Sequence, residues 1–194
     1  MKNSKLAQLL STFDPGQWRQ FEDFVASPFF NKSEELIRLT AYLKGFAPDI
    51  TSSEVTAEQA CKAVAPGKPY DARQMGYWMN YLHKLGEQFV SIRRYQLNTP
   101  RQYCDVLNEF SERKLDKHYL FLYRKAEGDV ERALADTESL RFRYELAETA
   151  SKHFIRQRVR SFDSGLQHAA DALDQLYFLQ KLKYSCEMLN RQAI

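Results

Sequence analysis

Residues 166–188 read LQHAADALDQLYFLQKLKYSCEM, and their apolar side chains recur every three or four positions. This spacing is typical of an α-helix and differs from the strict alternation of a β-strand. The pattern continues toward Ile194 without the glycine or proline that usually ends a helix. We therefore expect a long C-terminal helix, and a chain that continues beyond Ile194 is one explanation of its open end.

The same periodicity extends toward the N-terminus, interrupted by residues that cap or break helices. In the N-terminal half, Asp14-Pro15, Ser33 and Asp71 precede apolar runs, as helix caps do. The C-terminal half has no strand-like alternation, and 7 Gly and 6 Pro are few for a chain of tight β-turns. The sequence therefore predicts an all-α fold. Four helices are expected in its second half, at about 100–114, 117–135, 137–160 and 166–192.

Two pairs of aromatic residues in the N-terminal half are expected to be buried. Phe29 and Phe30 lie in a turn between two predicted helices, where they would fill the helix junction. Tyr77 and Tyr81 lie beside the apolar face of the first long helix and would widen that face. A helix with so wide an apolar arc normally packs on more than one neighbour.

The predicted helices fall into two groups, an N-terminal helical module at residues 1–98 and antiparallel helical hairpins at residues 99–194. Shifted by 36 residues, segment 140–150 matches segment 176–186, with two leucines and a phenylalanine in register. Periods of about 34 to 47 residues are typical of helical-hairpin repeats. We expect a helical bundle followed by a TPR/HEAT-like repeat array, although two unrelated amphipathic helices could produce the same match.

Composition restricts the class of protein. The 28 basic and 25 acidic residues are nearly balanced, so the net charge of +3 permits nucleic acid as a partner without indicating it. The three cysteines are far apart and form no CxxC pair, which indicates reduced thiols. No apolar run approaches the roughly 20 residues of a membrane span, and the first apolar stretch, residues 6–10, is shorter than the apolar region expected of a signal peptide. We expect a cytoplasmic protein that does not enter a membrane.

Residue patterns for catalysis or metal binding are absent. The four histidines lie in separate predicted helices, at His83, His118, His153 and His168. Neither an HExxH motif nor a Cys/His pair at zinc-ligand spacing occurs. The Gly67-Lys68 turn lacks the first glycine and the Ser/Thr of a phosphate-binding loop. With no nucleophile and base in a known pattern, we expect no enzyme activity, no cofactor and no metal.

The helix expected at 137–160 carries the strongest local charge. Residues 141–160 contain six basic side chains against two acidic ones. This strip could contact phosphates or an acidic partner, or it could be a solvated helix face on which Glu148 pairs with a lysine four residues later. Its candidate binding residues are Lys152, Arg156, Arg158 and Arg160.

Residues 51–89 are a second candidate segment for binding nucleic acid. A short helix, a Pro-Gly turn and a long helix with Arg73 near its start follow one another. This order is loosely similar to the winged-helix domains of bacterial regulators. No glycine-bearing β-hairpin wing follows, and the second helix offers little positive charge for a phosphate-lined groove. A nucleic-acid-binding or regulatory protein is therefore the alternative function.

Two stretches carry a family resemblance. Residues 24–39 read FVASPFFNKSEELIRL, and residues 69–85 read PYDARQMGYWMNYLHKL. Both resemble uncharacterised proteins of the Bacteroidetes group, which tend to be longer than this chain and mostly helical. The resemblance covers mainly the first 95 residues. It implies a helical fold and brings no activity with it.

The C-terminal helix points to the expected function. Its apolar residues fall on two sides, with Leu176, Leu179, Leu182, Cys186 and Leu189 on one and Leu173, Tyr177 and Tyr184 on the other. One side must be covered by further chain, a partner or a second copy. We expect a non-enzymatic intracellular interaction module that binds protein or peptide partners, or itself, through this helix. The candidate contacts here are Leu179, Leu182 and Leu189.

Overall fold

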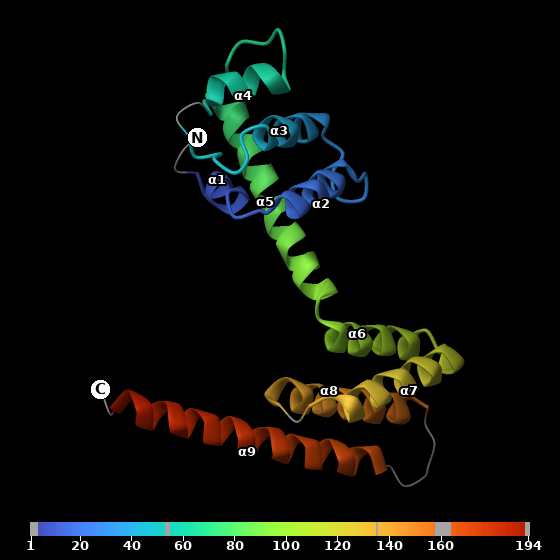
Figure 1. The fold of residues 1–194 in the computed structure, drawn as a ribbon. Helices are drawn as coiled ribbons and strands as arrows, with labels where there is room; N and C mark the ends of the chain where they lie inside the picture. The colour runs from blue at the N-terminus through green and yellow to red at the C-terminus, as the bar shows by residue number, and fades with distance from the viewer. Residues whose placement is uncertain (1–3, 53–54, 135, 158–163, 193–194) are drawn as a thin grey trace. The chain divides into compact units, whose positions relative to one another are not determined.

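The computed structural model describes residues 4–52, 55–134, 136–157 and 164–192. In these ranges all regular secondary structure is α-helical, which confirms the predicted fold class (Figure 1). The chain forms two compact units, residues 1–94 (unit 1) and 95–194 (unit 2). Within the described ranges, every helix is too short or too polar to cross a lipid bilayer.

Unit 1 is built from helices whose first turns are capped as the sequence predicts. The Asp14 side chain accepts a hydrogen bond from the Gln17 backbone at 2.8 Å, and the Gln17 side chain accepts one from the Asp14 backbone at 2.9 Å. The hydroxyl groups of Ser33 and Thr56 cap later helices by accepting a hydrogen bond from the backbone N–H of Leu36 and of Gln59. The helices are α1 (Lys5–Leu10), α2 (Pro15–Ala26), α3 (Glu34–Lys44), α4 (Ala57–Val64) and α5 (Ala72–Gln96).

The core of unit 1 is a cluster of aromatic rings between α2 and α5. The Phe21 ring is fully buried, with its centroid 5.5 Å from that of Phe13 and 5.4 Å from that of Phe89. Helices α3 and α4 add buried aliphatic side chains, among them Leu39 and Val64. Figure 1 shows α1 to α4 gathered around the first part of α5. The apolar stripe of α5 is therefore covered by several neighbours.

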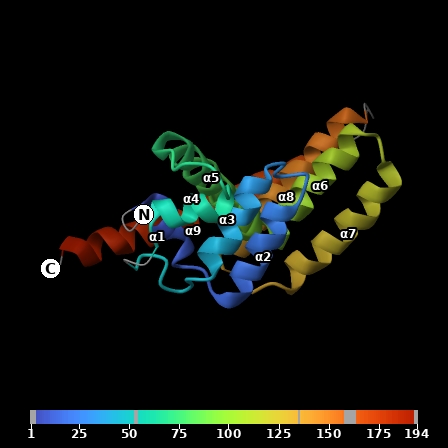
Figure 2. The ribbon, with the colours of Figure 1, turned by 90° about the horizontal axis from the view of Figure 1, so that it is seen from above.

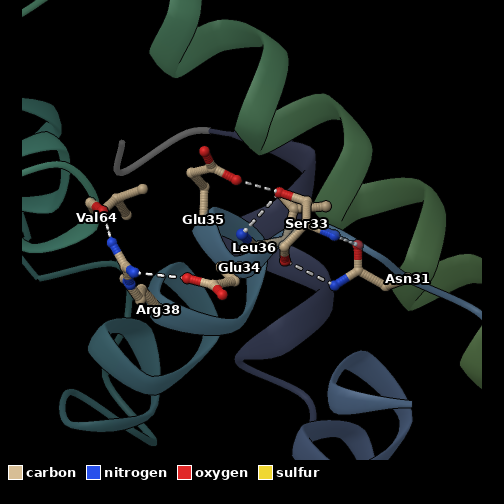
Figure 3. Close-up of polar contacts among 7 residues, drawn as sticks. All are labelled: Asn31, Ser33, Glu34, Glu35, Leu36, Arg38 and Val64. Atoms are coloured by element: carbon tan, nitrogen blue, oxygen red, sulfur yellow. Dashed lines mark hydrogen bonds and ion pairs between the residues drawn. The ribbon is translucent and has the colours of Figure 1, made fainter. Parts of the chain in front are cut away.

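The connection between α2 and α3 is held by one buried amide (Figure 3). The Nδ2 atom of Asn31 donates to the carbonyl oxygens of Val25 at 2.9 Å and Ser33 at 3.0 Å, and Oδ1 accepts from the Ser33 backbone at 2.9 Å. The Ser33 hydroxyl donates to Glu35 at 2.7 Å, which lowers the pKa of that carboxyl group. The side chain of Asn31 thus fixes the start of α3 relative to the end of α2.

Unit 2 is a stack of four helices in the described ranges. Helix α6 packs on α7, both pack on α8, and α8 packs along α9. Asp136 and Ser139 form a capping box at the start of α8. The predicted helix at 137–160 is described as far as Arg156, and the predicted starts and ends elsewhere differ by a few residues. The helices are α6 (Thr99–Glu112), α7 (Asp116–Arg132), α8 (Thr137–Arg156) and α9 (Ser164–Gln192).

The core of unit 2 lies among α6, α7 and α8. Leu107 of α6 is fully buried there, together with Tyr119 and Ala126 of α7 and Phe142 and Leu146 of α8. Of α9, Ala169 and Ala172 are buried. Small side chains bring the axis of α9 close to α8 and bury little apolar area of α9 itself. The packing of α9 therefore differs from that of the three helices before it.

The TPR/HEAT-like repeat is not confirmed and stays a prediction. The 36-residue offset aligns α8 with α9, whereas a repeat of hairpins would align alternate helices, such as α6 with α8. The aligned side chains also differ in burial: Phe142 and Leu146 are 5% and 4% exposed, but Phe178 and Leu182 are 68% and 62% exposed. The match therefore reflects the apolar spacing that two successive helices share.

Candidate interaction surface

One side of α9 faces α8, and small or half-buried side chains line it. Ala169, Ala172, Leu176 and Leu179 recur at helical spacing along this side. Helix α9 has 29 residues and α8 has 20, which correspond to lengths of about 44 and 30 Å. In Figures 1 and 2 the C-terminal end of α9 extends beyond the other helices of unit 2. Unit 2 therefore covers one side of α9 and only part of its length.

Two groups of exposed apolar side chains occupy the other sides of α9. Both follow the helical repeat, so each forms a continuous line along the helix. The first, which we call the tyrosine stripe, comprises Leu166, Leu173, Tyr177, Tyr184 and Met188. The second, the leucine stripe, comprises Phe178, Leu182 and Leu189. Every member of both stripes is exposed.

This exposure is unusual for a helix of such composition. A helix with apolar residues on all sides normally has neighbours on all sides, and contiguous exposed apolar patches mark interaction sites. Helix α8 provides the comparison inside the same unit, because α6, α7 and α9 all contact it. Among the described helices, α8 is the one that packs on α9. The two stripes are therefore the clearest candidate for a surface that another molecule covers.

The structure places the leucines predicted to bind a partner on two different sides of α9. Leu182 and Leu189 are exposed in the leucine stripe, whereas Leu179 is half-buried on the side toward α8. The exposed leucines also lie far along α9 from Arg156, where the described part of the basic strip ends. Helix α9 begins after the short connection that follows Arg156, so Leu182, 18 residues beyond its first residue, lies about 27 Å along its axis. Lys152 and Arg156 therefore do not form one surface with the exposed leucines of α9.

Two candidate binding residues of the basic strip, Lys152 and Arg156, form ion pairs with carboxylates. Lys152 Nζ lies 3.1 Å from an oxygen of Glu148, and a guanidinium nitrogen of Arg156 lies 2.9 Å from an oxygen of Glu112. The Glu148–Lys152 pair is the one that the i,i+4 spacing predicts, whereas Glu112 belongs to α6. Arg158 and Arg160 lie outside the described residues. Lys152 thus pairs with the preceding turn of α8, and Arg156 connects α8 to α6.

The segment proposed to resemble a helix-turn-helix has a structural role in unit 1. Residues 51–89 include α4 and most of α5, with Gly67 at a φ of 85° in the turn between them. Helix α5 contributes buried residues to the core of unit 1, and the next element described is α6 rather than a β-hairpin. Arg73 and Lys84 are its exposed cations between 72 and 85. This is little charge for binding a phosphate backbone.

A cleft of about 620 Å³ between α6, α7 and α8 in unit 2 is not predicted by sequence patterns. His153 lies in it, buried, with its ring stacked on Tyr119 at 3.6 Å between centroids. The Gln157 amide nitrogen lies 2.9 Å from Nε2, and because an amide nitrogen can only donate, Nε2 accepts. Nδ1 then carries the proton and donates to Ser111 Oγ at 2.9 Å. His153 is therefore held in its neutral form.

The surroundings of His153 resemble a Ser-His-Asp set in composition but not in geometry. Asp116 Oδ1 lies 4.0 Å from Nε2, beyond hydrogen-bond distance, and Gln157 occupies that nitrogen. Burial lowers the pKa of the imidazole, which Asp116 raises and Arg156 lowers to smaller extents. The hydrogen bond to Ser111 joins α8 to α6. Within the described ranges, no group of three or more His, Cys, Asp or Glu residues is arranged to hold a metal ion.

Unit 1 presents a second exposed aromatic region, contrary to the prediction of buried rings. Phe30 stacks on Phe24 with centroids 4.1 Å apart, but Phe29 is 87% exposed. The expectation for Phe29 is wrong because Phe24 and Phe89 already fill the helix junction. Tyr77 and Tyr81 are also exposed, so the expectation that they are buried is wrong too. Both line a cleft of about 690 Å³, with Asn31, Lys32, Ser33, Glu35, Leu36, Gln74 and Trp78 as its other lining residues.

Residues 24–39 and 69–85, which carry the resemblance to proteins of the Bacteroidetes group, border this cleft. The first stretch supplies Asn31 and the start of α3, and the second supplies the tyrosines of α5. That resemblance stays a prediction. Comparison of the chain with protein-family models, curated proteins and solved structures found no match.

Proposed function

We propose that this chain is a non-enzymatic helical module that binds protein partners through α9. The observation that supports the proposal is the pair of exposed apolar stripes on a helix that has one described neighbour. Burial of apolar area is the main favourable term in most protein association. Eight large side chains in two continuous lines supply that area.

The charge of α9 favours protein over nucleic acid or a lipid surface. Three acidic and three basic residues share the helix, Asp171, Asp174, Glu187, Lys181, Lys183 and Arg191. Helices that bind phosphate backbones or anionic membranes carry an excess of positive charge. Because α9 is balanced and its exposed stripes are apolar, a protein surface is the ligand that its chemistry fits best.

We place this module in the reducing cytoplasm. Cys61, Cys104 and Cys186 are free thiols in the structure, and the first two are buried. Burial raises the pKa of Cys104 to about 11, so its unreactive thiol form predominates at neutral pH. Free thiols of this kind persist in compartments that keep cysteine reduced.

Site-specific photocrosslinking in cells tests the proposed function. A photoreactive amino acid replaces Tyr177 in one variant and Leu182 in another, and a third variant carries it at Arg124, an exposed residue of α7. Mass spectrometry then identifies the adducts. Protein adducts at positions 177 or 182, but not at 124, would support the proposal. Adducts to nucleic acid, or no protein adduct at either position of α9, would contradict it.

A further inference from the structure

We infer that the tyrosine stripe of α9 binds α9 of a second copy of this chain, with the two helices antiparallel. The inference rests on the proposed function and identifies one of its partners. The tyrosine stripe carries five large side chains over 23 residues, from Leu166 to Met188. Two such helices would form a twofold interface, the commonest arrangement of soluble oligomers.

Two charged residues border the tyrosine stripe on the same side. Asp174 directly follows Leu173, and Lys181 lies seven residues later, which is about two helical turns. Both side chains are exposed, and in the described part of the chain neither takes part in an ion pair. A rise of about 10 Å along the helix keeps them from pairing with each other. Each is therefore available to a residue of opposite charge outside the chain.

The order of these charges selects the direction of the second helix. In a parallel dimer in register, Asp174 would lie beside Asp174 of the second copy and Lys181 beside Lys181, with like charges close together. In an antiparallel dimer, a twofold axis beside Tyr177 lies midway between residues 174 and 181. That axis places Asp174 of each copy opposite Lys181 of the other, which forms two equivalent ion pairs. Charges that flank an apolar seam commonly set helix orientation in this way.

The same axis also pairs the apolar side chains. The axis places Tyr184 of each copy less than one helical turn from Leu173 of the other, and the two Tyr177 side chains lie at the centre. The two tyrosines can each expose up to about 150–250 Å², and the three aliphatic side chains somewhat less, so the half-exposed stripe offers about 500 Å² per copy. The total of about 1,000 Å² is at the lower limit for a specific interface. The leucine stripe remains free for a different protein.

Charge-swap variants of the full chain test the pairing by sedimentation velocity over a concentration series. The inference predicts that the wild-type chain dimerises, and that Asp174→Lys and Lys181→Asp each weaken dimerisation about tenfold, because both ion pairs become repulsive. Mixing the two variants in equal amounts should restore a dimer, because each then meets opposite charges. Asp171→Lys makes the same charge change on the side of the leucine stripe and should dimerise like the wild type. Circular dichroism verifies that all variants keep their helix content.

Three results would overturn the inference: a wild-type chain that is monomeric throughout, an Asp174→Lys variant that dimerises like the wild type, or a mixture no more associated than either variant alone. A monomeric chain whose α9 positions still crosslink to other proteins would contradict the second copy and leave the proposed function standing. The two proposals can therefore fail separately.

Discussion

Helices α5 and α9 are the two longest in the described chain, with 25 and 29 residues, and apolar side chains spread around both. The apolar stripe of α5 packs in the core of unit 1, so Leu82 is fully buried and Phe89 joins the aromatic core. Helix α9 has α8 on one side, and Leu182 is 62% exposed. Apolar spacing therefore predicts which helix faces will be buried. The tertiary structure determines whether the same chain provides the residues that bury them.

The largest expected difference in stability is between truncation of a leucine in α5 and truncation of a leucine in α9. Leu82→Ala should lower the free energy of unfolding of unit 1 by about 2–5 kcal/mol, because it leaves a cavity in a closed core. Leu182→Ala should change the stability of the monomer by less than about 0.5 kcal/mol. Both tryptophans, Trp18 and Trp78, lie in unit 1, so tryptophan fluorescence during urea unfolding measures the first effect. Circular dichroism at low protein concentration measures the second, and equal effects would refute the contrast.

A smaller effect on stability is expected at the polar connection between α2 and α3 in unit 1. Asn31→Ala removes three hydrogen bonds and leaves buried backbone groups without partners, which should cost about 1–3 kcal/mol. The matched control is Asn80→Ala on the exposed face of α5, which should be nearly neutral. Tryptophan fluorescence follows both variants. A neutral Asn31→Ala variant would show that the connection does not depend on this amide.

The smallest effect concerns unit 2 and its dependence on pH. Burial lowers the pKa of His153 below its ordinary 6.5, so the unfolded chain binds a proton more readily than the folded one. The stability of unit 2 should therefore fall as the pH drops through 6.5 toward the lowered folded-state pKa. His153→Gln should remove this contribution, whereas His168→Gln, at an exposed position, should keep it.

Two probes isolate unit 2 in that experiment. Circular dichroism follows both units, and tryptophan fluorescence follows unit 1 alone, so the difference between their transitions belongs to unit 2. Unfolding curves at pH 7.5 and about pH 5.5 span the ordinary histidine pKa. If the wild type and His153→Gln lose the same stability on acidification, His153 is not the group that titrates.

Local signals predict much of the fold. Asp14, Ser33 and Asp71 cap helices where the sequence places caps, because a cap depends on residues two or three positions away. The four helices of unit 2 begin within a few residues of their predicted starts for the same reason. The exposed leucines of α9 also follow from counting positions along one helix, because α8 can cover only one side.

Contacts between distant residues are not predictable in this way. Arg156 pairs with Glu112, 44 residues earlier, so its charge cannot be judged from α8 alone. Phe29 is exposed because Phe24 and Phe89 fill the junction, and the second of these lies 60 residues away. The bonds of His153 to α6 likewise exist only once the helices pack. Each of these residues is placed by a partner that no local pattern contains.

Hydrogen–deuterium exchange of the wild-type chain at low and high protein concentration tests the central claim, that α9 is covered by another molecule, most directly. We predict that amides of α9 exchange more slowly at high concentration, while those of α5 exchange at the same rate at both, because the core of unit 1 already covers the apolar stripe of α5. If α9 is as slow as α5 at every concentration, the helix is stable without a second copy and the account of α9 is contradicted.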